Sequence, residues 1–292
     1  MQAYMSPDWA DTTAQQLVSR GLVPAGICLL LGGIDTGKTS LAVALAKRLA
    51  KNQPVGFIDV DIGQSHIGPP TTVGWTVVDS PQADILQLPT LGLSFVGHVT
   101  PVGHLLQLTA GMVQGVQQLS KVAKVIIIDT PGFIAGPAAA ALWWTVQQIV
   151  NPGSILAVQR SGELMHILDG VRFFDCHLEE IACPSNIPMK SPQQRKKYRQ
   201  KRFSEYFRRS CTYDVKLSDA TVQSRRGQRE DLTARAVGLR DGKGNDLAIG
   251  MIDSVQAGGA AVTIRAPQLD IRQVCCLVIG DVTVDIAGLP HA

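Results

Sequence analysis

The segment GGIDTGKT at residues 32–39 constrains the fold of this chain most, because it matches the phosphate-binding pattern G-x-x-x-x-G-K-[ST]. An apolar run, GICLLL, precedes the segment, and apolar residues at helical spacing follow it. In such a strand, loop and helix unit, the backbone N–H groups bind phosphates, Lys38 reaches the β- and γ-phosphates, and Thr39 holds Mg²⁺. The sequence therefore predicts a site for a nucleoside triphosphate with Mg²⁺. We expect this site to be formed by Gly32, Gly33, Ile34, Asp35, Thr36, Gly37, Lys38, Thr39 and Ser40.

The rest of the first 212 residues alternates between strand-like and helix-like stretches. Apolar runs of strand length occur in VGFIDVDIG, KVIIIDTPG and SILAVQR, and helical patterns occur at 105–121, 138–150 and 162–174. Strands this apolar belong to a sheet that is buried on both faces. The pattern predicts an α/β fold, a P-loop NTPase parallel sheet with helices on both faces. It would span residues 26–212, after an N-terminal helical segment at 1–25.

The pattern changes near Tyr213. From there the chain contains short alternating runs such as AVGLRD, LAIGMIDSV and AVTIRA, which glycine-containing turns separate. Alternation of apolar and polar residues is typical of strands with one buried face. We therefore predict a small β-rich C-terminal domain at residues 213–292.

Acidic residues follow two of the predicted strands in the α/β part. A P-loop enzyme needs a second carboxylate near Mg²⁺, and Asp129, at the end of VIIID, is the expected residue. Asp59 and Asp61 lie two positions apart and so on the same side of a strand, where one could take a proton from an attacking hydroxyl group. The alternative is that both serve only in metal binding or capping. The predicted metal ligands are Thr39, Asp129 and Asp61.

Residues 190–209 contain nine Lys or Arg and one acid, which gives this segment a charge of +8 in a chain whose net charge is +3. Ser191 followed by Pro192 is a helix-start signal, so we predict a basic helix at 191–209. The simple interpretation of such a run is a solvated helix face. Next to a phosphate site, a stripe of guanidinium groups instead predicts a lid over the transferring phosphate. The stripe consists of Arg195, Arg199 and Arg202.

Composition and the first residues bear on the compartment. Hydrophobic residues make up 45% of the chain and charged residues 17%, which excludes a largely disordered protein. No apolar stretch approaches the roughly 18 residues of a membrane span, and the start has no signal-peptide pattern. We therefore expect a cytoplasmic protein with no membrane partner. The six cysteines show no metal-ligand spacing and are expected to be reduced core thiols: Cys28, Cys176, Cys183, Cys211, Cys275 and Cys276.

Together, these motifs resemble those of the polynucleotide 5'-hydroxyl kinase family, which includes the kinase subunit of the eukaryotic pre-mRNA cleavage factor, ribosomal-RNA-processing kinases and archaeal RNA kinases. Five blocks occur in the family's order: GGIDTGKTS, FIDVDIGQSHIGPPTTVG, FVGHVTPVGH, IIIDTPGFIAGPAAAAL and RKKYRQKRFSEYF. They are similar to its P-loop, its D-x-D-x-G-Q block, its G-x-x-S-P-x-G-H block, its T-x-G-W clasp and its lid. AVGLRD and LVIGDVTVD resemble its closing β-module, so the resemblance covers about residues 26–289.

The resemblance implies transfer of the γ-phosphate of ATP, with Mg²⁺, to the 5'-hydroxyl end of RNA or DNA. It implies that Lys38 binds phosphate, that Asp61 is the general base and that Asp59 supports it. The implied lid residues are Arg195, Arg199 and Arg202, and the implied acceptor-binding residues are Gln64, Thr130, Gly132 and Phe133.

The sequence also departs from the family pattern. Phe133 stands where the clasp usually has tryptophan, and Pro-Pro follows the GQ block where the family tends to have Pro-Gly. No counterpart of the eukaryotic members' N-terminal β-domain precedes the P-loop, from which we expect a stand-alone enzyme without cleavage-factor partners.

Two other functions stay open on the sequence alone. One is a nucleotide-dependent RNA-binding or assembly P-loop protein with little or no kinase activity, and the other is a small-molecule kinase. ATP is favoured over GTP only because no N-K-x-D loop follows SILAVQ. No motif selects RNA over DNA, because recognition of the 2'-hydroxyl has no sequence signature here.

Overall fold

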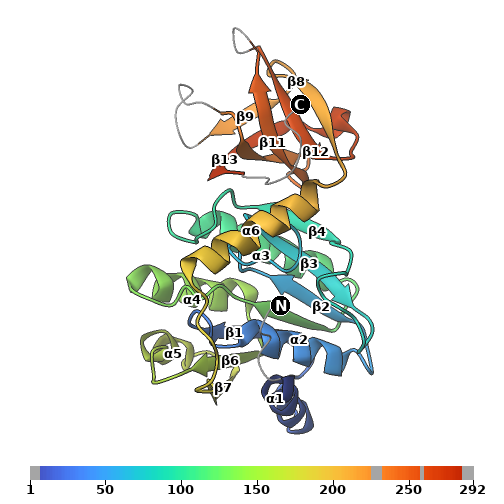
Figure 1. Cartoon of the computed structure of the whole chain (residues 1–292). Coiled ribbons are helices and arrows are strands. Elements are labelled where there is room, and N and C mark those ends of the chain that lie inside the picture. Colours follow the sequence, from blue (N-terminus) through green and yellow to red (C-terminus); the bar gives the residue numbers. More distant parts are fainter. Residues whose placement is uncertain (1–6, 225–231, 257–259, 285–292) are drawn as a thin grey trace.

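Seven strands form the larger of two sheets in the computed structural model, which describes residues 7–224, 232–256 and 260–284 (Figure 1). The strands are β1 (Gly26–Gly32), β2 (Val55–Asp59), β3 (Thr72–Val78), β4 (Gly92–Phe95), β5 (Val125–Asp129), β6 (Ser154–Gln159) and β7 (His177–Ala182). Their order across the sheet is β4-β3-β2-β5-β1-β6-β7. The phosphate-binding segment follows β1, which lies between β5 and β6.

The predicted parallel sheet is confirmed for its four predicted strands, β1, β2, β5 and β6, to which β7 adds a fifth that was not predicted, and it is wrong at one edge. β2, β5, β1, β6 and β7 are parallel, whereas β3 pairs antiparallel with β2 and with β4. The chain passes from β2 to β3 through a loop at residues 60–71 and not through a helix. Parallel pairing needs a long crossover connection, so a strand that returns without one pairs antiparallel.

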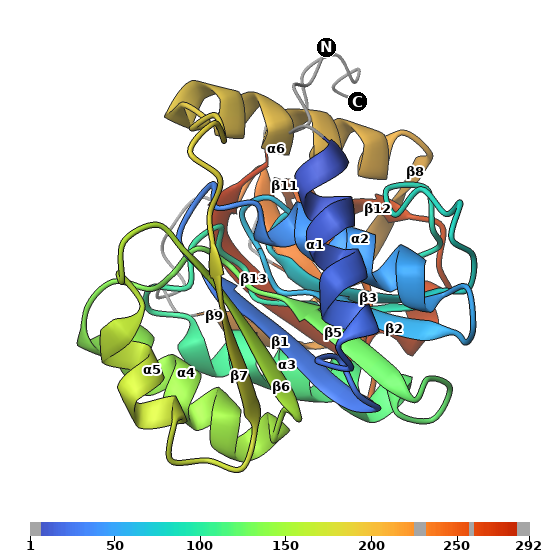
Figure 2. The ribbon, with the colours of Figure 1, turned by 90° about the horizontal axis from the view of Figure 1, so that it is seen from below.

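Helices cover both faces of this sheet, as the sequence predicts (Figures 1 and 2). Leu30 of β1 packs on the face covered by α1 and α2, and its neighbour Leu29 packs on the face covered by α3, α4 and α5. Because successive strand residues point to opposite faces, a strand covered on both faces must be apolar throughout. The helices are α1 (Pro7–Ser19), α2 (Lys38–Leu49), α3 (Leu105–Leu119), α4 (Pro137–Val150) and α5 (Met165–Val171).

The C-terminal part forms a second sheet of six strands in the order β8-β12-β11-β10-β13-β9. Neighbouring strands are antiparallel, except that β9 is parallel to β13. The predicted β-rich C-terminal fold is therefore confirmed, while the division of the chain at residues 26 and 213 stays a prediction. The strands are β8 (Ser210–Lys216), β9 (Thr221–Ser224), β10 (Arg235–Arg240), β11 (Asp246–Val255), β12 (Ala261–Pro267) and β13 (Cys276–Thr283), with a 3-10 turn at Ile271–Gln273.

Helix α6 (Pro192–Phe207) runs across the α/β part and leads into the second sheet (Figure 1). It begins with a capping box, in which the Gln194 N–H donates to Ser191 Oγ at 3.2 Å and the Ser191 N–H donates to Gln194 Oε1 at 2.7 Å. Pro192 occupies the first turn, where a missing N–H costs nothing. These local signals explain why the basic helix starts where the sequence indicates.

The cysteines are free, and only Cys28 is fully buried. The prediction of core thiols is wrong for Cys211 and Cys275, which are exposed, because both lie in or beside strands of the second sheet, where alternate residues face solvent. Among the described residues, no helix combines the length and the apolar character that crossing a membrane requires.

Candidate active site

The phosphate-binding loop joins β1 to the first residue of α2. Gly37 adopts φ 87° at the N-terminus of α2, and no side chain caps that helix end. The first N–H groups of α2 are therefore available to an anion, which the helix dipole also favours. Gly32 has no room for a side chain, because a Cβ there would lie 2.4 Å from the Val158 carbonyl oxygen. The loop is thus a phosphate cradle built by close backbone packing.

Lys38 is almost completely buried at the base of this loop, and its Nζ donates to the Gly33 carbonyl oxygen at 2.7 Å. Burial lowers the pKa of Lys38, although the nearby carboxylates of Asp129, Asp61 and Asp35 oppose the shift. Among the described residues, Gly33 supplies the one hydrogen-bond acceptor of this ammonium group, which leaves its other N–H groups uncompensated. Phosphate oxygens would supply the missing acceptors.

Asp59 and Asp129 lie side by side, because they are register partners at the carboxyl ends of β2 and β5. Burial raises the pKa of Asp129 to about 6, with Lys38 and Thr39 opposing the shift and Asp61 adding to it. Burial also raises the pKa of Asp59 well above its usual range, and the charges of Asp129 and Asp61 add to the effect. Two buried carboxyl groups at the carboxyl ends of neighbouring strands create a negatively charged site that favours binding of a cation.

The Asp129 carboxylate fits the predicted role beside Mg²⁺. Both of its oxygens are buried and accept no hydrogen bond from a described residue, although the Thr39 hydroxyl is close enough to lower the pKa of that carboxyl group. Carboxylate and hydroxyl oxygens are ligands that Mg²⁺ prefers, and Mg²⁺ usually takes one or two of them together with substrate phosphates. In the described part of the chain, three or more His, Cys, Asp or Glu side chains nowhere form a complete metal site.

Asp61 lies beyond the end of β2, so the expectation that it shares one side of the strand with Asp59 is wrong in detail. The chain turns directly after Asp59, whose Oδ1 accepts the Asp61 N–H at 3.0 Å. Asp61 Oδ1 in turn accepts the N–H groups of Gly63 at 3.1 Å and Gln64 at 3.0 Å. Its Oδ2 accepts no hydrogen bond from a described residue. One carboxylate oxygen is thus held in place and the other is free to accept a proton.

A cavity of about 650 Å³ connects the phosphate loop with the turn that carries Asp61. Several predicted residues line it, from the phosphate loop, from the Asp61 turn, from the loop after β5 and from α6. They are Ile34, Asp35, Thr36, Gly37, Lys38, Thr39, Ser40, Asp61, Gln64, Gly132 and Arg195. The other lining residues include His66 and Lys190.

Of the predicted acceptor-binding residues, Thr130 and Phe133 do not line this cavity, whereas Gly132 does. The Thr130 hydroxyl is buried and donates to the Leu30 carbonyl oxygen at 2.5 Å. Phe133 packs against the core of the larger sheet, and its carbonyl oxygen accepts the Trp143 Nε1–H at 2.7 Å. Gly132 packs on the phosphate loop, because a Cβ there would lie 2.5 Å from Cγ1 of Ile34. These three residues therefore shape the site, and their contact with an acceptor stays a prediction.

The three arginines of the predicted lid make different contacts. Arg195 Nη2 lies 2.5 Å from Oδ2 of Asp35 in the phosphate loop. Burial lowers the pKa of Arg199, as does the charge of Arg195, whereas Asp61 opposes the shift. Unlike Arg195, Arg199 does not line the cavity.

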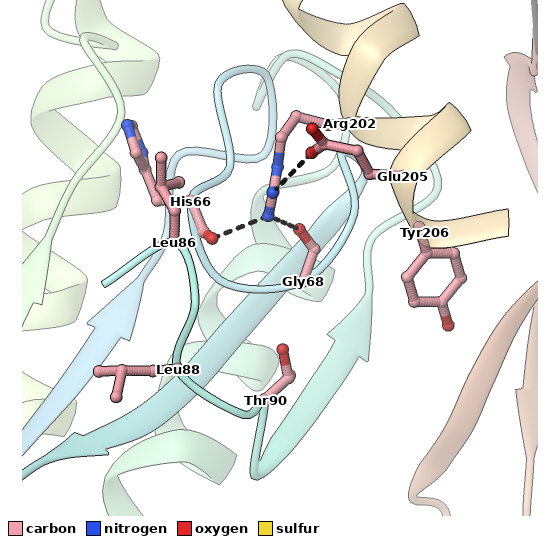
Figure 3. A pocket seen from close by; sticks show the side chains of 8 residues that line it. All are labelled: His66, Gly68, Leu86, Leu88, Thr90, Arg202, Glu205 and Tyr206. Atoms are coloured by element: carbon pink, nitrogen blue, oxygen red, sulfur yellow. Dashed lines mark hydrogen bonds and ion pairs between the residues drawn. The ribbon is translucent and has the colours of Figure 1, made fainter. Parts of the chain in front are cut away.

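Arg202 is turned toward the loop that follows Asp61 (Figure 3). Its Nη2 donates to the carbonyl oxygens of His66 at 2.8 Å and Gly68 at 3.0 Å, and its Nη1 pairs with Glu205 at 3.2 Å. A smaller pocket of about 170 Å³ lies beside these contacts. Tyr198 adds a further link, since its hydroxyl donates to the Ser65 carbonyl oxygen at 2.9 Å. Arg202 thus holds α6 to this loop.

Sequence reasoning missed Arg160, which directly follows β6. Its Nη1 donates to the Ile34 carbonyl oxygen at 3.3 Å and its Nη2 to the Asp35 carbonyl oxygen at 2.5 Å. The signal was available, because a basic residue at the carboxyl end of the strand next to β1 lies at the same sheet edge as the phosphate loop. Arg160 thus fixes the backbone of the phosphate loop through two carbonyl oxygens.

A family model described as "mRNA cleavage and polyadenylation factor CLP1 P-loop" matches residues 32–209. The polyribonucleotide 5'-hydroxyl-kinase of Pyrococcus horikoshii is 33% identical over 214 residues, which cover 72% of this chain and 57% of that protein. The corresponding kinase of Methanocaldococcus jannaschii is 30% identical, covering 66% and 54%, and the CLP1 homolog of Anopheles gambiae is 27% identical, covering 67% and 50%. The chain thus spans about half the length of these curated relatives.

The fold also resembles that of a solved structure. The wild-type Clp1p–Pcf11p complex matches with a TM-score of 0.72 and 14% sequence identity, covering 97% of this chain and 80% of that one. At this level of identity the similarity concerns the fold alone.

Proposed function

Since the chain belongs to the CLP1 P-loop family, we propose that it is a polynucleotide 5'-hydroxyl kinase that transfers the γ-phosphate of ATP to the 5'-hydroxyl end of RNA or DNA. One observation carries this proposal. A single cavity is lined by Lys38 in the phosphate loop, by Asp61 with its free carboxylate oxygen and by Arg195 at the start of α6. The relatives named as polyribonucleotide 5'-hydroxyl-kinases support the same activity.

ATP and Mg²⁺ are the proposed donor and metal. The phosphate loop and the buried Lys38 would hold the β- and γ-phosphates, and Thr39 and Asp129 would hold the metal. Bound there, Mg²⁺ would supply positive charge next to the phosphate oxygens. The assignment of Asp129 as a metal ligand is supported by its two buried carboxylate oxygens, which accept no hydrogen bond from a described residue.

In the proposed reaction, the 5'-oxygen of the acceptor forms a bond to the γ-phosphorus as the bond from that phosphorus to the β–γ bridging oxygen breaks. The proton of the 5'-hydroxyl group passes to Asp61, whose other oxygen is fixed by the Gly63 and Gln64 N–H groups. The charge on the transferring group is met by Lys38 and Arg199. The products are ADP and a 5'-phosphorylated polynucleotide.

The test is a transfer assay with γ-labelled ATP and 5'-hydroxyl oligonucleotides of RNA and of DNA. We expect label on the oligonucleotide, and none on a matched oligonucleotide that already carries a 5'-phosphate. Asp61→Asn should abolish transfer while ATP binding, measured by calorimetry, persists. Label that appears only as free phosphate, or on no product, would instead indicate an assembly factor, and label on a nucleoside alone would indicate a small-molecule kinase.

A further inference from the structure

Asp35 lies inside the phosphate loop, yet its carboxylate contacts the lid segment. Its side chain is only 8% exposed, and Oδ2 accepts the Lys190 N–H at 2.8 Å and Arg195 Nη2 at 2.5 Å. The residue adopts φ 53°, a left-handed conformation that aspartate tolerates better than most residues. Arg160 also donates to the Asp35 carbonyl oxygen and so holds the backbone of this residue in place.

The guanidinium group of Arg195 uses most of its hydrogen bonds in the contact between the phosphate loop and the start of α6. Besides Asp35, its guanidinium donates twice to the Lys190 carbonyl oxygen, from Nε at 3.3 Å and from Nη2 at 3.1 Å. These bonds tie the segment before α6, the first turn of α6 and the phosphate loop into one unit. An arginine so occupied has few N–H groups left for a phosphate.

Arg199 lies four residues further along the same helix face, about 6 Å along the helix axis. In the described part of the chain, no hydrogen bond or ion pair holds its guanidinium group, and Asp61 is one of the charges that act on it. Arg199 does not line the cavity itself, so where its guanidinium group lies depends on where the start of α6 is held.

We propose that Asp35 and Arg195 form a latch that positions Arg199 over the phosphate site, so that Asp35 and Arg195 are positioning residues and Arg199 is the lid cation that acts on the transferring phosphate. The latch also explains an acid in a phosphate loop. Alone, the Asp35 carboxylate would repel a triphosphate, whereas paired with Arg195 it is locally neutral. The inference deepens the proposed function and rests on it.

A mutant cycle on the 5'-kinase reaction tests the latch. Asp35→Asn and Arg195→Gln should each lower kcat by about 10- to 100-fold, as small misplacements of catalytic groups do, and should change ATP affinity by less than about twofold. The double variant should be no worse than the worse single variant, because both changes open the same latch. Lys197→Gln, which removes an exposed charge from the same helix, should leave kcat unchanged.

The sharpest measurement is the cost of Arg199→Ala in two backgrounds. We expect a loss on the order of 10³-fold in the otherwise wild-type protein and only about tenfold in Asp35→Asn, where Arg199 is already misplaced. Asp35→Glu should recover part of the activity. An equal cost in both backgrounds, an unchanged kcat in Asp35→Asn or a parallel loss of ATP affinity would each overturn the latch.

Hydrogen exchange separates failure of the latch from failure of the proposed function. In Asp35→Asn, the amides of residues 190–199 should exchange faster than in the wild type, and in Lys197→Gln they should not. If the wild type transferred no phosphate, the proposed function would fail, and faster exchange in Asp35→Asn would still support the latch. Unchanged exchange would overturn it.

Discussion

The two ends of helix α6 are held by opposite kinds of interaction. At the first turn, Arg195 and the Lys190 N–H bind one carboxylate of the phosphate loop. At the last turns, Phe203 and Phe207 are buried in an apolar cluster that includes residues of β4, β10 and β11. The first end is polar and next to the proposed chemistry, whereas the second joins the two sheets.

The first end of α6 should therefore affect the rate of the proposed reaction, and the last end should affect the stability of the fold. The Asp35–Arg195 ion pair contributes less to the free energy of unfolding than burial of large apolar side chains does, so its main effect is on where the start of α6 lies. Burial of two phenylalanine side chains contributes several kcal/mol and fixes the helix axis. We therefore expect changes at the first end to alter turnover and changes at the second end to alter the free energy of unfolding.

Arg199→Ala should have the largest effect and should act on turnover only. Loss of a cation that meets the transferring phosphoryl group costs on the order of 10³-fold or more in kcat, about 4 kcal/mol. ATP affinity and the urea midpoint should change little. Equal losses in kcat and in ATP affinity would place Arg199 in the ground-state nucleotide site instead.

Phe207→Ala should have the largest effect on stability. The side chain is completely buried, so its removal should lower the free energy of unfolding by about 3–5 kcal/mol in urea denaturation. Phe173→Ala offers a matched control, because that phenylalanine is 91% exposed and its loss should cost less than about 0.5 kcal/mol. Similar costs for the two variants would contradict the proposed anchor.

Tyr206→Phe should have an intermediate effect that depends on pH. The Ile249 N–H donates to the Tyr206 hydroxyl oxygen at 3.0 Å, so its removal leaves an unpaired donor and should cost about 1–2 kcal/mol at pH 7. Burial raises the pKa of Tyr206 to about 12, above its usual value of 10.0. The stabilisation from the protonated phenol is therefore complete below pH 10 and is lost as the pH rises toward 12.

The measurement is urea denaturation of wild type and Tyr206→Phe at pH 7 and at about pH 11. The free energy of unfolding should fall more for the wild type than for the variant over this range, so the difference between the two values should become smaller. An unchanged difference would mean that burial does not raise the pKa of Tyr206, and a larger difference at about pH 11 would mean that the folded protein stabilises the phenolate.

Lys201→Ala should have the smallest effect. The Lys201 side chain is 71% exposed, and its Nζ lies 3.6 Å from Oε1 of Glu205, one turn later on α6. Exposed pairs of this spacing contribute about 0.3–0.5 kcal/mol, and the order Lys before Glu is the weaker one. A change in the free energy of unfolding above about 1 kcal/mol would show that the middle of α6 is more tightly coupled than its contacts indicate.

Much of the site could be predicted because short-range rules govern its parts. The phosphate loop follows from glycine spacing between a strand and a helix, and α6 follows from Ser191 and Pro192 at its start. Strands β3, β4 and β7 were not predicted. The antiparallel pairing of β3 could not be predicted either, because pairing direction depends on the connection between strands and not on their own residues.

By itself, the sequence determined the phosphate loop, the buried parallel strands, the β-rich C-terminal part and the basic helix, since each follows from residue types and spacing within one segment. Only the tertiary structure decided that Arg195 binds Asp35, 160 positions away, that Arg160 reaches the same loop across 125 positions, and that Arg202 donates to carbonyl oxygens of the loop after Asp61. The physical reason is that an ion pair or hydrogen bond depends on the distance between segments, which packing of the whole chain sets and local propensity does not encode.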